Sequence, residues 1–317
     1  EITCRDWSSD VCSSDLTLNT GTSLLNEVDG NITMNNGVII AKTAGGDATL
    51  TFKATGDITL EGNNSITSSA GKLNVILNAD SGTPGSGGIT IKHHTTINSH
   101  GGNIVMGGGA ACTTAGCGAA AFGTGAAGTA GIFIDDNSFG AITINSGGGN
   151  IWMSGSAPAA GGAGIHLKNV SITSGAGSVY MKGTGVHSGG MGGPENDGAG
   201  IFLKNSTVIA GAGGMTLDGT AADGGVNSTR AISFTGDGSK AYTTNTGALT
   251  VNANQSYMSG LFFHTENAND MLGHATLQSG NITLNYTGAA GAPSGGLPNI
   301  QNPSGNLTVV ASGSVQG

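Results

Sequence analysis

The stretch Gly164–Lys182, which reads GIHLKNVSITSGAGSVYMK, decides the fold. It contains three short runs in which apolar and polar residues alternate, and a turn-forming residue or a Gly-rich bend separates each run from the next. Alternation with a period of two is the pattern of a half-buried β-strand. The stretch therefore predicts three short strands joined by tight bends.

The same three-part unit recurs on both sides of this stretch. Its first strand, GIHLKN, resembles GIFIDD at Gly131–Asp136, 33 residues earlier, and GIFLKN at Gly200–Asn205, 36 residues later. The apolar pairs expected in the second strand are Ile142/Ile144, Val170/Ile172 and Val208/Ile209, and those in the third are Ile151/Met153, Val179/Met181 and Met215/Leu217. A unit that repeats at this spacing predicts a repeat architecture.

A shorter motif, Gly-x-h-x-h with h a large aliphatic residue, runs through the whole chain. It begins at twelve glycines: Gly30, Gly56, Gly71, Gly87, Gly102, Gly140, Gly149, Gly177, Gly213, Gly247, Gly280 and Gly305. The middle residue is usually threonine, which suits the wet face of a strand because it is β-branched and polar. A strand with one apolar face cannot bury that face alone, whereas stacked copies can.

These patterns predict an all-β chain folded as a right-handed parallel β-helix, a solenoid with three short strands per coil and roughly ten coils. Four Gly- and Ala-rich segments follow the third strand of a unit, and we expect them to form loops on one edge of the stack. They are residues 107–130, 154–163, 183–199 and 219–230.

Composition excludes several other classes. The 317 residues include 60 glycines but no continuous triplet repeat, so the chain is not collagen. Neither a run of about 18 apolar residues nor a basic character is present, and the net charge is −9. We therefore expect neither insertion of this segment into a membrane nor a nucleic-acid partner.

Residues 1–16 differ from everything after them. Glu1–Leu16 (EITCRDWSSDVCSSDL) resembles one translated reading frame of a sequencing-library adapter. We interpret it as non-native and expect residues 17–317 to be a β-helix repeat segment truncated at both ends.

Units such as Gly-Asn-Ile-Thr-Leu, Gly-Asn-Leu-Thr-Val and Gly-Ala-Ile-Thr-Ile resemble the repeats of filamentous-haemagglutinin-type adhesins, the two-partner-secretion exoproteins; autotransporter passenger domains have related repeats. The resemblance covers about Gly30 to Val310 and lies in the repeat style. It implies a secreted, cell-surface shaft segment that mediates attachment or aggregation, with an outer-membrane transporter for export and a surface glycan or protein as partner. The alternative is a carbohydrate-active β-helix enzyme, a polysaccharide lyase or glycoside hydrolase.

Candidate catalytic and metal-binding residues are few. Asp135-Asp136 is the only acidic doublet after residue 16, but adjacent strand residues point to opposite faces, so we interpret it as a surface charge pair. Asp136 aligns with Asn169 and Asn205 in an expected ladder of turn residues. His93, His94 and His100 lack a partner at ligand spacing, and His166 is expected to point outward. We predict no enzyme activity, catalytic residue, cofactor or metal.

Two features remain as candidates for function. Cys112 and Cys117 enclose a Thr-Thr-Ala-Gly turn and form either a small disulfide or two free thiols. Trp152 and Tyr180 are outward residues of equivalent strands, so they should lie side by side with Lys182 nearby. They form either a platform for sugar rings or a partner surface, or an extension of the core beneath a loop.

Overall fold

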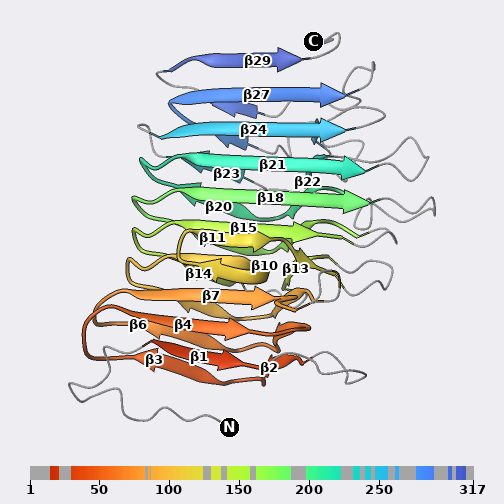
Figure 1. Ribbon diagram of the computed structural model, residues 1–317. Helices are drawn as coiled ribbons and strands as arrows, with labels where there is room; N and C mark the ends of the chain where they lie inside the picture. The colour runs from red at the N-terminus through yellow and green to blue at the C-terminus, as the bar shows by residue number, and fades with distance from the viewer. Residues whose placement is uncertain are drawn as a thin grey trace.

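The computed structural model is a right-handed parallel β-helix with three strands per coil (Figure 1). It describes residues 15–20, 30–82, 85, 87–123, 130–136, 141–157, 162–186, 198–222, 231–235, 240–243, 247–255, 261–263, 276–288, 299–301 and 305–311. Nothing in this part of the chain is a helix long and apolar enough to cross a membrane.

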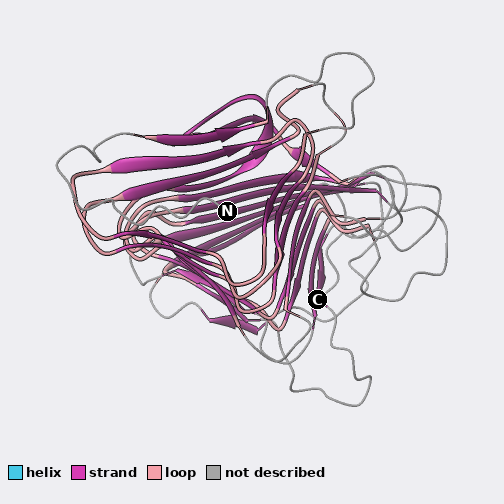
Figure 2. Ribbon diagram, turned by 90° about the horizontal axis from the view of Figure 1, so that it is seen from below, coloured by secondary structure: helices cyan, strands magenta, loops and turns pink. Residues whose placement is uncertain are grey.

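Three sheets, named A, B and C, form the wall of the tube (Figure 2). Along the chain, each coil passes through sheet B, then sheet C, then sheet A. Ten strands follow one another along sheet A, which confirms the predicted number of coils. They are β1 (Leu16–Asn19), β4 (Ala48–Lys53), β7 (Leu73–Ala79), β10 (Ile104–Thr113), β15 (Ile151–Ser156), β18 (Val179–Val186), β21 (Met215–Ala222), β24 (Ala248–Gln255), β27 (Asn281–Gly288) and β29 (Leu307–Ala311).

Sheets B and C are built from shorter strands, all of which pair in parallel. Sheet B contains β2 (Ile32–Met34), β5 (Ile58–Leu60), β8 (Ile89–Lys92), β13 (Ile132–Asp135), β16 (Ile165–Lys168), β19 (Ile201–Lys204), β22 (Ile232–Thr235) and β25 (Leu261–Phe263). Sheet C contains β3 (Ile39–Lys42), β6 (Ser65–Ser68), β9 (Thr96–Asn98), β14 (Ile142–Asn145), β17 (Val170–Thr173), β20 (Thr207–Ala210), β23 (Lys240–Thr243), β26 (Thr276–Gln278) and β28 (Asn299–Gln301).

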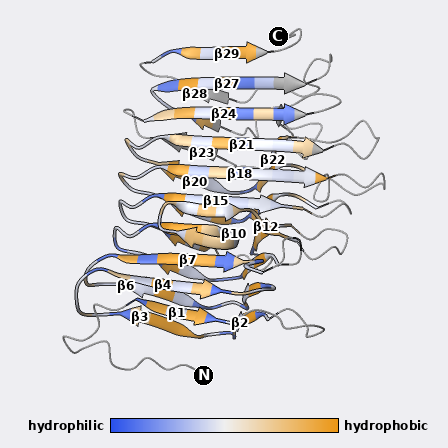
Figure 3. Ribbon diagram, viewed as in Figure 1, coloured by the Kyte–Doolittle hydropathy of each residue, from blue (hydrophilic) through white to orange (hydrophobic). Residues whose placement is uncertain are grey.

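The core is a set of aliphatic columns inside the tube. Ile132, Ile165 and Ile201 occupy successive rungs of sheet B in register, and each is fully buried. Figure 3 shows the apolar and polar residues alternating along the strands. Each coil buries its inward residues on the coils above and below, so one continuous hydrophobic cluster extends through the stack.

The register differs from the predicted one in sheet C. Val208 pairs with Ile172, not with Val170, and Ile209 is half-buried on the outer face. The prediction of an inward Val208/Ile209 pair was wrong because a strand cannot turn two adjacent side chains to the same face. The hydroxyl of Ser206 instead accepts a hydrogen bond from the Val170 backbone N–H at 3.2 Å.

Strands of sheet A also run further than predicted. β18 and β21 continue as paired strands through Val186 and Ala222, into segments that were expected to be loops from residues 183 and 219. Glycine is required there because a Cβ at Gly183 would fall onto the carbonyl oxygen of Gly200, where sheet A approaches the entry to sheet B. Glycine-rich sequence at this edge therefore marks close packing as well as turns.

Candidate functional site: an aromatic groove on sheet A

Two aromatic rings lie side by side on the outer face of sheet A. Trp152 of β15 pairs in register with Tyr180 of β18, as the repeat alignment predicted. Their ring centroids are 6.1 Å apart and the planes are inclined by 20°, so the rings are stacked. Both side chains are half-buried, which leaves part of each ring accessible.

A hairpin covers one side of the indole ring. β10 continues past the core to Thr113, and β11 (Gly116–Ala119) returns antiparallel to it. The hairpin joins Cys112 to Cys117 in a disulfide with an S–S distance of 1.93 Å. Its backbone lies close to Trp152, since a Cβ at Gly116 would be 3.0 Å from Cε2 of the indole.

The alternative to a platform was that a loop, residues 183–199, folds over the aromatic pair. Residues 187–197 of this loop lie outside the described part of the chain, so this alternative is not tested there. The cover that the structure does describe comes from the 107–130 segment. Asn103 Nδ2 donates a hydrogen bond to the carbonyl of Thr114 at 3.0 Å and so holds the hairpin tip against sheet A.

An open groove of about 490 Å³ lies between this hairpin and the aromatic pair. Its lining residues are Cys117, Gly118, Ala119, Ala120, Trp152, Ser154, Gly155, Tyr180, Lys182 and Thr184. Lys182 is the only charged side chain among them and is exposed. The structure thus brings together Trp152, Tyr180 and Lys182 and places the Cys112–Cys117 disulfide beside them.

The phenol of Tyr180 stays neutral at physiological pH. Burial raises its pKa above the usual 10, and the carboxylate of Asp218 adds to the shift. Asp218 stands one rung above Lys182 in direct register. The groove therefore offers a neutral hydroxyl, a cation and two aromatic rings on two adjacent rungs.

A second aromatic cluster lies outside sheet B. The ring of His166 stacks between Phe133 and Phe202, with centroid distances of 4.7 and 4.8 Å. His166 points away from the tube core, as expected, yet only 6% of it is exposed. Ala130, Ala163 and Ala199 pack against this outer stack, which consists of Phe133, His166 and Phe202.

Asp135 belongs to the same region and is buried. Its Oδ2 lies 3.7 Å from Lys168 Nζ and 3.9 Å from His166 Nε2. Asp136 is fully buried, and its Oδ2 accepts a hydrogen bond from the His94 backbone N–H at 3.3 Å. The interpretation as a surface charge pair was therefore wrong, because neighbouring coils cover both carboxylates.

The turn ladder predicted beside this doublet is present. Asn169 and Asn205 both adopt positive φ, at 54° and 48°, which asparagine tolerates better than most residues. Asn169 Nδ2 donates to the carbonyl of Asp136 at 2.7 Å and links consecutive coils.

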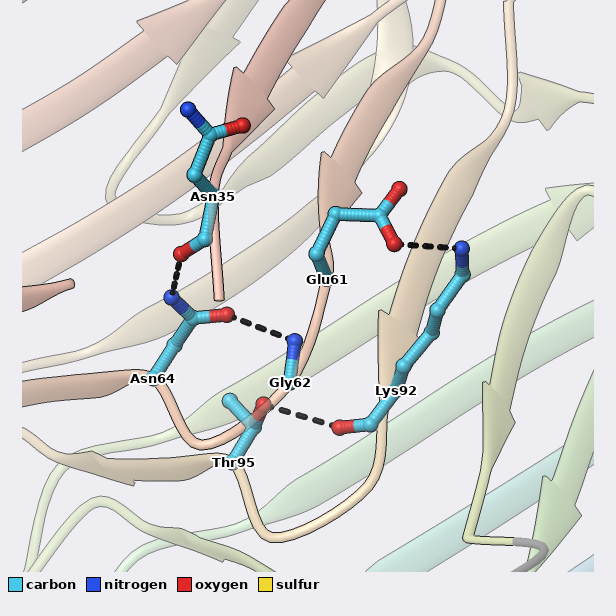
Figure 4. Close-up of polar contacts among 6 residues, drawn as sticks. All are labelled: Asn35, Glu61, Gly62, Asn64, Lys92 and Thr95. Atoms are coloured by element: carbon cyan, nitrogen blue, oxygen red, sulfur yellow. Dashed lines mark hydrogen bonds and ion pairs between the residues drawn. The ribbon is translucent and has the colours of Figure 1, made fainter. Parts of the chain in front are cut away.

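The same corner in lower coils is shown in Figure 4. Asn64 Nδ2 donates to the carbonyl of Asn35 at 2.6 Å, and its Oδ1 accepts from the Gly62 N–H at 2.9 Å. Glu61 and Lys92 form an ion pair at 2.7 Å across adjacent rungs. The Asn64–Asn35 and Glu61–Lys92 contacts tie coil to coil, which is a structural role.

The described histidines do not gather around a common point. His93 and His94 meet edge to face, and His100 Nδ1 lies 3.2 Å from the carbonyl of Gly71. Across the described residues, no three His, Cys, Asp or Glu side chains come close enough together to hold a metal ion.

Sequence reasoning missed two polar ladders. The residue after the motif glycine is often asparagine, and its side-chain oxygen accepts a backbone N–H from the next coil: Asn103 from Asn150 at 2.8 Å, and Asn150 from Ser178 at 2.9 Å. Asn74, the middle residue of its own motif, holds the same register position and accepts from the Asn103 N–H at 2.9 Å. The signal was the Asn at Gly-Asn-h-x-h, visible at Asn103 and Asn150.

The second ladder lies at the corner between sheets C and A. Ser99, Ser146 and Ser174 are fully buried, and each hydroxyl donates to the carbonyl of the glycine three residues later. One coil below Ser99, Ser68 holds the same position and donates to the carbonyl of Gly71. In the next coil down, Lys42 takes this place and donates to the carbonyls of Gly45 and Ala70. The spacing Ser-x-x-Gly before a strand was the signal.

Comparisons with protein-family models, with curated proteins and with solved structures gave no match for this chain.

Proposed function

We propose that the chain is a non-enzymatic shaft segment of a large secreted bacterial adhesin, which holds binding surfaces away from the cell and mediates attachment or aggregation. The observation that carries the proposal is the unbroken stack of ten rungs on sheet A. At the usual ~4.8 Å between strands, ten rungs form a rod roughly 43 Å long. The repeat style shared with filamentous-haemagglutinin-type exoproteins gives such a rod a natural role at the cell surface. Export would require an outer-membrane transporter, and the partner would be a surface glycan or protein.

The state of the acidic doublet supports a non-catalytic role. Asp135 is 7% exposed and Asp136 is fully buried, so neither carboxylate is placed to attack or protonate an external polysaccharide. Hydrolysis of a glycosidic bond requires two accessible carboxyl groups on either side of the bond.

Display of the 317-residue chain on a non-adherent bacterium tests the adhesive role. We expect the displaying cells to aggregate, or to attach to glycoprotein-coated surfaces, more than cells that carry the anchor alone. A shortened chain that lacks residues 165–200 serves as the matched variant, because Ile165 and Ile201 occupy the same register position and one whole coil is removed. Attachment no better than that of the anchor alone would overturn the proposal.

Incubation of the purified chain with acidic and neutral polysaccharides tests the enzyme alternative. We expect no new reducing ends and no unsaturated sugar product. Sugar release that disappears in an Asp135→Asn variant would instead establish an enzyme.

A further inference from the structure

We propose that the groove between the disulfide-closed hairpin and the Trp152–Tyr180 pair binds a saccharide that carries a carboxylate. This inference deepens the proposed adhesive function by naming a ligand class, and the experiment below can fail without the shaft assignment failing.

The apolar part of the groove suits a sugar ring. One face of a pyranose presents C–H groups, which pack on aromatic rings, whereas its hydroxyls need polar partners at the edge. The stacked rings of Trp152 and Tyr180 supply the aromatic surface, and Ser154 and Thr184 supply hydroxyls from the same strands. A volume of about 490 Å³ lies within the roughly 300–1,000 Å³ typical of small-molecule sites.

The charge in the groove selects an acidic sugar. Among the described residues that line the groove, Lys182 is the only charged one and is exposed, so a carboxylate entering the groove meets one cation and no acid of this set. The chain as a whole carries −9, which repels polyanions in general. The attraction for a carboxylate is thus confined to the position of Lys182. The carboxylate of Asp218, on the next rung, disfavours a second acidic group beside that position.

The hairpin makes the groove rigid before a ligand arrives. The Cys112–Cys117 disulfide closes its tip, and the Asn103–Thr114 hydrogen bond fixes it to sheet A. Close approach to the indole depends on glycine, because a Cβ at Gly107 would be 2.8 Å from Trp152 Cζ3. A pre-formed wall reduces the conformational-entropy cost of binding a ligand.

Tryptophan fluorescence provides a direct test on the whole chain. The sequence contains two tryptophans, so a Trp7→Phe background leaves Trp152 as the only reporter. Titration with galacturonate, which carries one carboxylate, should give a saturable change, and its methyl ester should bind at least tenfold more weakly. Lys182→Gln should also weaken binding about tenfold, whereas Lys72→Gln, an equal change of charge at another exposed lysine of the stack, should leave it unchanged.

Tyr180→Ala should weaken both the acid and the ester, since it removes a ring face common to both ligands, and circular dichroism checks that this variant is folded. Cys112→Ser with Cys117→Ser should weaken binding by loosening the wall. The proposal is overturned if no saturable change occurs at millimolar galacturonate, if the ester binds equally well, or if Lys182→Gln has no effect. If binding fails while displaying cells still attach, only the ligand assignment is lost.

Discussion

Leu167 and His166 are neighbours on β16 that point to opposite sides of the wall, and they belong to two different kinds of buried region. Leu167 is fully buried inside the tube between Ile134 and Leu203, which are aliphatic residues of the adjacent rungs. His166 is 6% exposed in the outer stack, between two phenylalanines and beside a charged pair. Inside the tube, closure of the coil alone guarantees burial. Outside the tube, burial depends on which side chains the neighbouring coils place at the same register position.

The largest expected effect separates these two regions directly. Leu167→Ala removes part of a core column and should lower the free energy of unfolding by about 3 kcal/mol, because a cavity remains. His166→Ala should cost only about 1 kcal/mol, the order that a stacked aromatic contact contributes. Urea unfolding followed by circular dichroism measures both. Equal losses would mean that the outer stack is as much a core as the tube.

The charged pair in the outer region gives the next effect. Asp135→Asn leaves Lys168, which is 17% exposed, without its carboxylate partner and should cost about 2 kcal/mol. A double variant with Lys168→Met should recover part of this loss, because no unpaired charge then remains. An additive double variant would show that the two groups do not interact.

Tyr286 of β27 tests the upper end of the tube core, against which it packs. Burial raises its pKa to about 12, so the folded chain favours the neutral phenol. Stability from this group is complete below pH 10 and is lost as the pH rises from 10 to 12; we expect about 1–2 kcal/mol after allowing for partial exposure. The difference between the chain and its Tyr286→Phe variant, measured by urea unfolding at pH 9 and pH 12, isolates this contribution from lysine titration. A constant difference would contradict burial of the ring.

The smallest effect concerns the polar corner. Ser174→Ala removes a buried hydrogen bond of 2.7 Å to the Gly177 carbonyl and should cost about 1 kcal/mol. Ala210 precedes Gly213 by the same three residues and serves as the matched position, since Ala210→Ser should change stability by less than about 0.5 kcal/mol in either direction. Thermal unfolding of both variants measures these effects. If Ser174→Ala leaves the stability unchanged, the serine ladder does not stabilise the fold.

Much of the tube could be predicted because the local alternation of apolar and polar residues determines which side chains point inward. Alternation within Ile165–Lys168 states which side chains point inward, and the recurrence of GIFLKN fixes which residues stack, so the contact between Trp152 and Tyr180 followed from alignment alone. The stacking of Phe133, His166 and Phe202 follows from the same alignment, because they hold one position of the repeat. Their burial could not be predicted in this way, because it depends on the packing of Ala130, Ala163 and Ala199 against the outer stack.

The groove was half predictable for the same reason. Its floor follows from register, whereas its wall depends on β10 running on beyond the core and turning back through a Gly- and Ala-rich segment. Such a segment has no apolar alternation, so nothing in its pattern distinguishes a paired hairpin from an unstructured loop. The contact between Gly116 and the indole arises only in the tertiary structure, so the local sequence does not predict it.

The hydrogen bonds between rungs run along the length of the rod, parallel to a force applied between its two ends. A pull on the ends therefore separates the terminal coil first and leaves the others intact. Each detached coil of about 33 residues adds roughly 110 Å of extended chain. A protein built this way lengthens in steps under load, and each step dissipates work before the next coil opens.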